Sequence, residues 1–399
     1  MQIIIIKLII IIFSIIPINI LCAKEKKDFN IGYYDLEKDI RYDEWGVHPV
    51  DIRSNKNQLY KRPIAGARLG LKDIKPFQRM AKVKFNIKEL RIKDIESAPD
   101  NILNHIKNNN INIVLIDFPS TELLKVVEKI SFLNIAIINI SSKNNELRST
   151  ICNDNLFHTI PSERMLSDSL AQYLSDKKWR KILMLTGPLE RDKAKAYSFV
   201  ESAKQFGLKI VENRNFLLGN DPRARDQNDL DFLTGSAKYD AVYIADTHKE
   251  FSYKVPFATH KPSAVIGSSG LTPRAWHWSY LRHGAPQVHG RFERMNNRRM
   301  SGEDWAAWVA MRAIAEALVR FKDEENFSFH TAFINDNFKL DGSKGPVLNF
   351  RPWNRQLRQP IMLSTENWVT SIAPLESFVH RENNLDTIGI DSSKSKCGK

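Results

Sequence analysis

The stretch NIVLIDFPSTELLKVVEKI, residues 112–130, decides the fold class that we predict for this chain. It begins with a short apolar run, 112–118, of the kind that forms a buried strand. Ser120 and Thr121 follow where a helix N-cap belongs, and apolar residues then recur at helical spacing up to Ile130. A buried strand followed by an amphipathic helix is half of a βαβ unit, so we expect a parallel sheet covered by helices.

The same alternation of strands and helices runs in both directions from this unit. The predicted strands are 29–34, 82–92, 112–118 and 136–142 in a first series and 181–187, 208–213, 240–246 and 263–270 in a second. The predicted helices lie near 66–74, at 163–174 after an N-cap at Ser162, at 192–207, and at 305–319 after a capping box that starts at Ser301. At 399 residues the chain is long enough for two such α/β lobes, each with a doubly wound sheet.

The N-terminal segment 1–23, MQIIIIKLIIIIFSIIPINILCA, differs in composition from the rest of the chain. One charge, Lys7, lies early in a long apolar block, and polar residues start directly at Lys24, which is the layout of a secretory signal peptide. We expect cleavage after Ala23 and export to the periplasm. An uncleaved anchor is the alternative, because the apolar run is close to the ~20 residues that span a membrane.

The chain carries 59 Lys and Arg against 46 Asp and Glu, which gives a formal net charge of +13. These basic residues are dispersed, and no basic block or RNA- or DNA-binding motif accompanies them. We therefore expect no nucleic-acid partner. The charge predicts a solvated basic surface that favours an anionic ligand.

Three cysteines are present, and one of them, Cys22, belongs to the predicted leader. The mature chain would keep Cys152 and Cys397, and an even pair in an oxidising compartment suggests a disulfide. Such a bond would hold the C-terminal tail against the middle of the chain. Two unpaired thiols are the alternative, since spacing in the sequence does not show that the two residues meet.

Polar residues follow the predicted strands at the ends where ligands of open parallel sheets bind, beyond the carboxyl ends of the strands. The predicted ligand-binding residues at these ends are Asp117, Ser120, Thr121, Ser141 and Ser142 in the first series and Asp246, Ser268 and Ser269 in the second. The two serines of GSSG, 267–270, stand between glycines that allow close approach of a backbone. Helix capping, a plain turn or surface placement would explain several of these residues as well.

The segment AWHWSYL, 275–281, adds aromatic candidates. If it is extended, Trp276 and Trp278 lie on one side and form an apolar wall for a flat ligand, with His277 pointing the other way. We include all three among the predicted ligand-binding residues. Packing in the core is the alternative for the tryptophans.

The sequence has none of the common catalytic, cofactor or metal motifs. It contains no G-x-x-x-x-G-K-[ST], H-E-x-x-H or C-x-x-C, no G-x-G-x-x-G after a strand, and no G-x-S-x-G nucleophile elbow. The acidic cluster 221–231 lacks the order of a calcium loop and includes two arginines, and no histidine pair has ligand spacing. We expect no catalytic activity, no cofactor and no metal site.

Several long blocks of the sequence resemble one protein family. They are HTIPSERMLSDSLAQYLSDKKWRKILMLTGP (158–188), LGNDPRARDQNDL (218–230), GLTPRAWHW (270–278), DWAAW (304–308), LDGSKGPVLNFRPWNRQLRQPI (340–361) and HRENNLDTIGID (380–391). Together they resemble the type I periplasmic binding proteins of ABC importers, related to branched-chain amino acid binders, in the branch encoded beside PQQ-dependent alcohol dehydrogenases. A cysteine near the end of such proteins matches Cys397, which supports its pairing with Cys152. One departure is that Asn354 and Arg355 stand where the family pattern has Asp-Gly.

The resemblance implies two lobes joined by a multi-strand hinge that the chain crosses more than once. We expect the first lobe to comprise 24–142 and a return segment, 283–335. The second lobe would comprise 143–282 and 336–399.

The resemblance also implies a function. The chain would bind a small ligand between its lobes and pass it to an ABC permease and ATPase, as a monomer that meets the membrane only through the permease. A functional link to a quinoprotein alcohol dehydrogenase makes an alcohol, its acid product, PQQ or a lanthanide ion the candidate ligands. The aromatic wall and many arginines favour an organic acid or quinone. A periplasmic accessory or sensory module that transports nothing is the alternative, and an enzyme of unrecognised type is a third.

Overall fold

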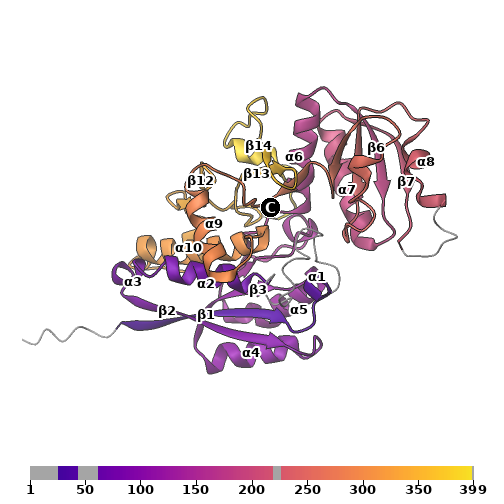
Figure 1. Ribbon diagram of the computed structural model, residues 1–399. Coiled ribbons are helices and arrows are strands. Elements are labelled where there is room, and N and C mark those ends of the chain that lie inside the picture. The colour runs from indigo at the N-terminus through magenta and orange to yellow at the C-terminus, as the bar shows by residue number, and fades with distance from the viewer. Residues whose placement is uncertain (1–25, 44–61, 219–225, 398–399) are drawn as a thin grey trace, which may run out of the picture.

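The computed structural model describes residues 26–43, 62–218 and 226–397, and within them it shows two α/β lobes (Figure 1). Each lobe contains one parallel sheet with helices packed against it, which confirms the predicted fold class. The expected signal peptide, 1–23, lies outside the described residues. In the part of the chain that is described, no helix combines the length and the apolar character needed to cross a membrane.

The first lobe is built on a five-stranded parallel sheet. Its strands lie in the order β2 (Val83–Ile92), β1 (Lys27–Leu36), β3 (Ile111–Asp117), β4 (Ile137–Asn139), β5 (Leu156–His158). Its helices are α1 (Ile40–Asp43), α2 (Ile64–Asp73), α3 (Phe77–Met80), α4 (Ala98–Asn108) and α5 (Ser120–Ile130). Along β3, Ile113 and Leu115 enter one apolar core and Val114 and Ile116 enter another, because successive side chains point to opposite faces.

The second lobe is built on a four-stranded parallel sheet. Its strands lie in the order β7 (Lys209–Asn215), β6 (Lys181–Thr186), β8 (Ala241–Ala245), β9 (Ala264–Gly267), and its helices are α6 (Glu163–Asp176), α7 (Glu190–Gln205) and α8 (Leu230–Thr234). The predicted cap of α6 is confirmed, since Oγ of Ser162 accepts a hydrogen bond from the backbone N–H of Met165 at 3.2 Å.

A later segment returns to the first lobe and packs on α2. It comprises α9 (Ala285–Asn296), α10 (Gly302–Phe321) and α11 (Phe329–Phe333). The predicted capping box at the start of α10 is confirmed, because Ser301 and Asp304 each accept a hydrogen bond from the backbone of the other. Gly66 allows α2 to approach this point closely, since a Cβ at Gly66 would lie 2.0 Å from the carbonyl oxygen of Asp304.

Two small antiparallel sheets complete the structure. One contains β10 (Thr272–Arg274), β13 (Ile361–Ser364) and β14 (Val369–Ala373), and all three strands contact α6 of the second lobe. The other pairs β11 (Leu340–Asp341) with β12 (Val347–Leu348), and β11 contacts α10 of the first lobe. The chain therefore passes between the lobes after β5, after β10 and between β12 and β13. The strand β5 lies past residue 142, where the sequence suggested the first boundary.

The C-terminal tail contacts both lobes. The predicted disulfide is confirmed, since Cys152 and Cys397 are bonded across 245 residues, and the N–H of Lys396 donates to the carbonyl of Ser149 at 2.9 Å. Toward the second lobe, the N–H of Gly389 donates to Oδ2 of Asp168 on α6 at 2.7 Å. Contacts of buried side chains with residues 385–388, directly before Gly389, also hold the tail.

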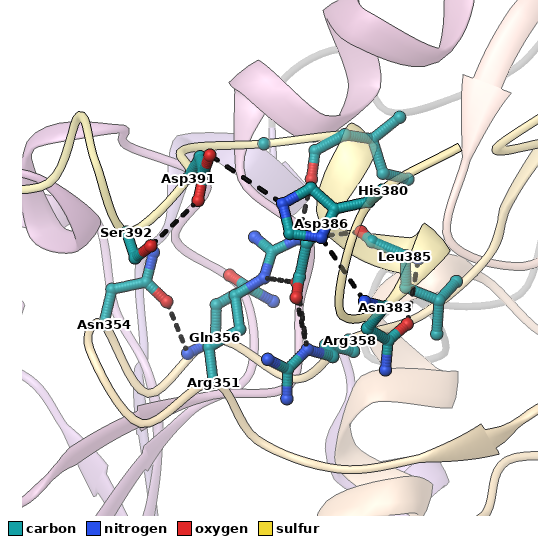
Figure 2. A network of polar contacts seen from close by, with 12 residues as sticks. Arg351, Asn354, Gln356, Arg358, His380, Asn383, Leu385, Asp386, Asp391 and Ser392 are labelled. Atoms are coloured by element: carbon teal, nitrogen blue, oxygen red, sulfur yellow. Dashed lines mark hydrogen bonds and ion pairs between the residues drawn. The ribbon is translucent and has the colours of Figure 1, made fainter. Parts of the chain in front are cut away.

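Figure 2 shows the polar network that holds the tail. The carboxylate of Asp386 is buried and accepts hydrogen bonds from Arg351 at 2.7 Å and from Arg358 at 2.9 Å. Arg351 also donates to the carbonyls of Leu385 and Ile388. Since both arginines are buried with their carboxylate partner, this network fixes the tail against the segment 351–358.

Candidate functional site

The carboxyl ends of the first-lobe strands carry a compact polar cluster. Asp117 ends β3 and is fully buried, and its Oδ1 accepts hydrogen bonds from Nη2 of Arg41 and from the hydroxyl of Tyr42, both at 3.0 Å. Arg41 also donates to Oγ of Ser141 at 2.8 Å and pairs with Asp39. Burial raises the pKa of Asp117, and the charge of Arg41 partly offsets this effect. The structure thus brings together Asp117 and Ser141 through an arginine that the sequence reasoning missed.

The remaining predicted ligand-binding residues of the first lobe are Ser142, Ser120 and Thr121. Their side chains are not part of the cluster around Asp117. Ser142 is buried, and its backbone N–H donates to Oδ1 of Asn139 at 2.9 Å. Ser120 and Thr121 are the first residues of α5 and line a cavity of about 250 Å³. The N-cap of α5 is Pro119, without a side-chain hydrogen bond, so the predicted capping by Ser120 or Thr121 is wrong.

The carboxyl ends of the second-lobe strands carry a second cluster. Asp246 is fully buried after β8 and accepts hydrogen bonds from the backbone N–H groups of Lys249 and Ser252, which makes it the anchor of its loop. Oγ of Ser268 accepts from the N–H of Asp246 at 2.9 Å and from Nζ of Lys195 at 3.1 Å. Asp246 and Ser268 are therefore in direct contact, whereas no polar contact of Ser269 is found among the described residues.

Four basic side chains come from elements of both lobes, and we call Lys143, Lys195, Lys249 and Arg274 the basic cluster. Lys143 follows β4 of the first lobe, Lys195 is on α7, Lys249 is in the loop after β8, and Arg274 ends β10. Burial, and then the positive charges of Arg274, Lys195 and Lys143, lower the pKa of Lys249 to about 7. The four groups are thus close enough to perturb one another across the lobes.

One member of the basic cluster is neutralised by a carboxylate of the first lobe. Nζ of Lys143 lies 2.8 Å from Oε1 of Glu303 at the start of α10. The remaining three members have no such ion pair in the described parts of the chain. Among those residues Nε of Arg274 is buried without a hydrogen-bond partner.

The aromatic segment after β10 is a turn rather than an extended wall. Trp276 is 2% exposed and stacks at 6.4 Å on Trp305 of α10, inside the first-lobe core. Trp278 is half-buried beneath the guanidinium of Arg299, which lies 3.8 Å from its ring centre. His277 is buried, with Nδ1 at 2.8 Å from Oγ of Ser279, and burial lowers its pKa to about 4.

Sequence reasoning missed Arg41 and the whole basic cluster. Lys143 directly follows Ser142, and Lys249 comes three residues after Asp246, so position after a strand was an available signal. It could not single them out, because the chain carries 59 Lys and Arg. The described residues hold no group of three or more His, Cys, Asp or Glu side chains arranged to bind a metal ion.

Two parallel-sheet lobes that the chain crosses repeatedly, with polar clusters at the facing strand ends, define the fold of the type I periplasmic binding proteins. Solved structures with this fold include the leucine-, isoleucine-, valine-, threonine- and alanine-binding protein of Brucella ovis, at 14% identity and a TM-score of 0.64 over 84% of this chain and 89% of that chain. They include a branched-chain amino acid ABC transporter ligand-binding protein of Burkholderia xenovorans, at 8% identity and a TM-score of 0.67 over 86% of this chain and 95% of that chain. A solute-binding protein of R. palustris in complex with benzoate matches at 9% identity and a TM-score of 0.65 over 93% of this chain and 100% of that chain.

At these identities the likeness shows the fold alone. No family model matches the chain, and no curated protein matches its sequence.

Proposed function

We propose that this protein is the periplasmic solute-binding component of an ABC importer and binds a small ligand between its two lobes. In this function the protein performs no chemistry. Ligand contacts made from both lobes would favour a closed form, which the permease and ATPase of the same system would recognise.

One observation carries this proposal, namely that basic side chains of both lobes lie close enough together for their charges to affect one another. Lys143 belongs to the first lobe and Lys195 and Lys249 to the second, yet their charges affect one another. A group held between them would touch both lobes at once. That is the geometry that couples binding to closure.

The solved structures with this fold support a small organic ligand. The Brucella ovis protein is named for five amino acids, and the R. palustris protein was crystallised with benzoate. An amino acid and benzoate share a carboxylate, and a carboxylate is a suitable partner for lysine and arginine. An organic acid is therefore the first candidate.

The finer proposal links this ligand to periplasmic PQQ-dependent alcohol oxidation. It rests on the sequence blocks that resemble the binding proteins encoded beside such dehydrogenases. An alcohol-derived acid and PQQ both carry carboxylates and suit the basic cluster. A lanthanide ion would need converging carboxylates instead.

Thermal unfolding and calorimetry of the chain without residues 1–23 test the proposal. The panel contains benzoate, benzyl alcohol, leucine, succinate, PQQ and lanthanum chloride. A true ligand should raise the unfolding temperature in a saturable way, following RT ln(1 + [L]/Kd). X-ray scattering with the stabilising compound should show a more compact particle.

Two outcomes would count against transport. Stabilisation without any change in the scattering profile would favour an accessory or sensory module over an importer component. Turnover of benzyl alcohol by the purified chain would instead favour an enzyme.

A further inference from the structure

Three members of the basic cluster have more hydrogen-bond donors than acceptors around them. In the described residues Nζ of Lys195 donates only to the neutral hydroxyl of Ser268, and Nζ of Lys249 has no hydrogen-bond partner. Nε of Arg274 is buried and equally without a partner among those residues. Of the three residues only Arg274 has a fully buried donor atom without a partner. Leaving a buried donor unpaired is costly, so this atom indicates a missing acceptor beside the two lysines.

The neighbouring carboxylates do not supply this acceptor. Glu163, Asp192 and Asp246 all lie close enough to Lys195 to affect its pKa, Glu163 most strongly, but none of them forms an ion pair with Lys195 among the described residues. However, Asp192 accepts hydrogen bonds from the backbone N–H and the hydroxyl of Thr247, and Asp246 accepts from two backbone N–H groups of its loop. The oxygens of Asp192 and Asp246 are therefore engaged in fixing the loop after β8.

The three donors are held by the framework rather than by one another. Lys195 projects from the long helix α7, and Arg274 ends β10, which is paired with β13. The backbone of Lys249 lies in the left-handed region, with φ at 63°, and its N–H donates to Oδ1 of Asp246. Donors that are positioned before binding lose less conformational entropy when a ligand arrives.

From this geometry we propose that Lys195, Lys249 and Arg274 form a carboxylate-binding subsite of the inter-lobe ligand site. The inference rests on the proposed function, since it names the ligand chemistry of that same site. It goes further in assigning three residues to the binding event.

The pH dependence of this binding follows from the charges that face Lys249. The largest of these come from Arg274 on β10, Lys195 on α7 and Lys143 after β4, and the carboxylate of Glu303 on α10 acts in the opposite direction. Burial and the three cations lower the pKa of Lys249 to about 7, so part of the population is neutral at pH 7. An anion bound beside Lys249 favours its charged form, so affinity should fall as the pH rises above about 7.

Calorimetry on the full chain without residues 1–23 tests this subsite with benzoate, succinate and PQQ, and with benzyl alcohol as the neutral match of benzoate. We expect the carboxylates to bind and benzyl alcohol to bind far more weakly. Lys249→Met and Arg274→Met should each weaken carboxylate binding by about thirtyfold or more. Lys193→Met is the matched control on the same helix as Lys195, because Lys193 is exposed, and it should change affinity less than about twofold.

A second variant separates charge from proton uptake. Titrations of the parent protein at pH 7 in two buffers of different ionisation enthalpy should report net proton uptake, and Lys249→Arg should bind without it because arginine stays charged. This substitution retains the positive charge, so it also covers a failure of Lys249→Met to fold.

The other possible results of these titrations would contradict the subsite alone or both proposals. Carboxylate binding that is unchanged in Lys249→Met and Arg274→Met overturns the subsite and leaves the proposed function standing. Binding of benzyl alcohol in preference to benzoate does the same. Binding of no compound in the wider panel overturns both proposals.

Discussion

Nζ of Lys143 lies 2.8 Å from Oε1 of Glu303, and this ion pair joins the connector after β4 to the start of α10, 160 residues later. Burial by itself would raise the pKa of Glu303, but the charge and hydrogen bond of Lys143 lower it to about 2. A carboxyl with a lowered pKa stabilises the folded state above its unfolded pKa of 4.5, and this contribution disappears as the pH falls toward 2.

The first prediction follows from this pair. Glu303→Gln should lower the free energy of unfolding by about 1–2 kcal/mol at pH 7, a value reduced for the exposure of the Lys143 side chain, which is 38%. Urea unfolding across pH 2 to 7 measures it. The difference between variant and parent should shrink as the pH falls from 4.5 toward 2, and a constant difference would mean that the ionisation of Glu303 is not responsible.

The second prediction concerns the disulfide between Cys152 and Cys397. Replacing both by serine should lower the free energy of unfolding by about 2–4 kcal/mol, because the bond closes a long loop in the unfolded chain. Urea unfolding of the double variant measures the loss, and the parent with a reducing agent should give a similar value. A parent protein that is insensitive to the reducing agent, with an equally stable double variant, would show that the tail network of Asp386 is sufficient without the bond.

The third prediction tests the close approach of α2 to α10. Gly66→Ala should lower the free energy of unfolding by at least about 2 kcal/mol, since the added Cβ would lie 2.0 Å from a backbone oxygen of Asp304 that cannot move freely. Gly290→Ala in α9 is the control, because its nearest neighbour is a flexible arginine side chain at 3.5 Å. The control should be neutral or stabilising by up to about 1 kcal/mol. Equal effects at the two sites would contradict the packing described here.

The fourth prediction separates the two tryptophans after β10. Trp276→Ala should cost about 3–5 kcal/mol of stability, because the ring is 2% exposed and stacks on Trp305. Trp278→Ala should cost much less, since the ring is only half-buried beneath Arg299. Thermal unfolding measures both. Calorimetry of Trp278→Ala with benzoate then tests whether this ring belongs to the ligand wall, which unchanged affinity would rule out.

The strands and helices of both sheets could be predicted because their signal is local. Apolar runs such as 112–118 and 181–187 became β3 and β6, and the caps at Ser162 and Ser301 lie at the helix starts where the sequence placed them. Arg355 stands where the family pattern has Gly, and its backbone conformation is also a local property. It has φ at 54°, a backbone conformation that suits the glycine expected there.

The site could be predicted only in part, because it depends on which strand ends meet. The sequence indicated Asp117, Ser141, Asp246 and Ser268 correctly as residues at strand ends, but it gave no means of selecting Lys143, Lys195, Lys249 and Arg274 among so many basic residues. Likewise, alternation suggested that Trp276 would face a ligand, whereas the return of α10 to the first lobe buries it.

The sequence by itself therefore determined the fold class, the order of its elements and the pair of cysteines, since these follow from hydrophobic periodicity and capping within short stretches. The tertiary structure decided which charges stand together. The three passes between the lobes bring residues more than 100 positions apart into contact, as with Lys143 and Glu303. Electrostatic effects act through space, so burial and neighbouring charges, rather than spacing along the chain, give Lys249 and Glu303 their altered pKa values.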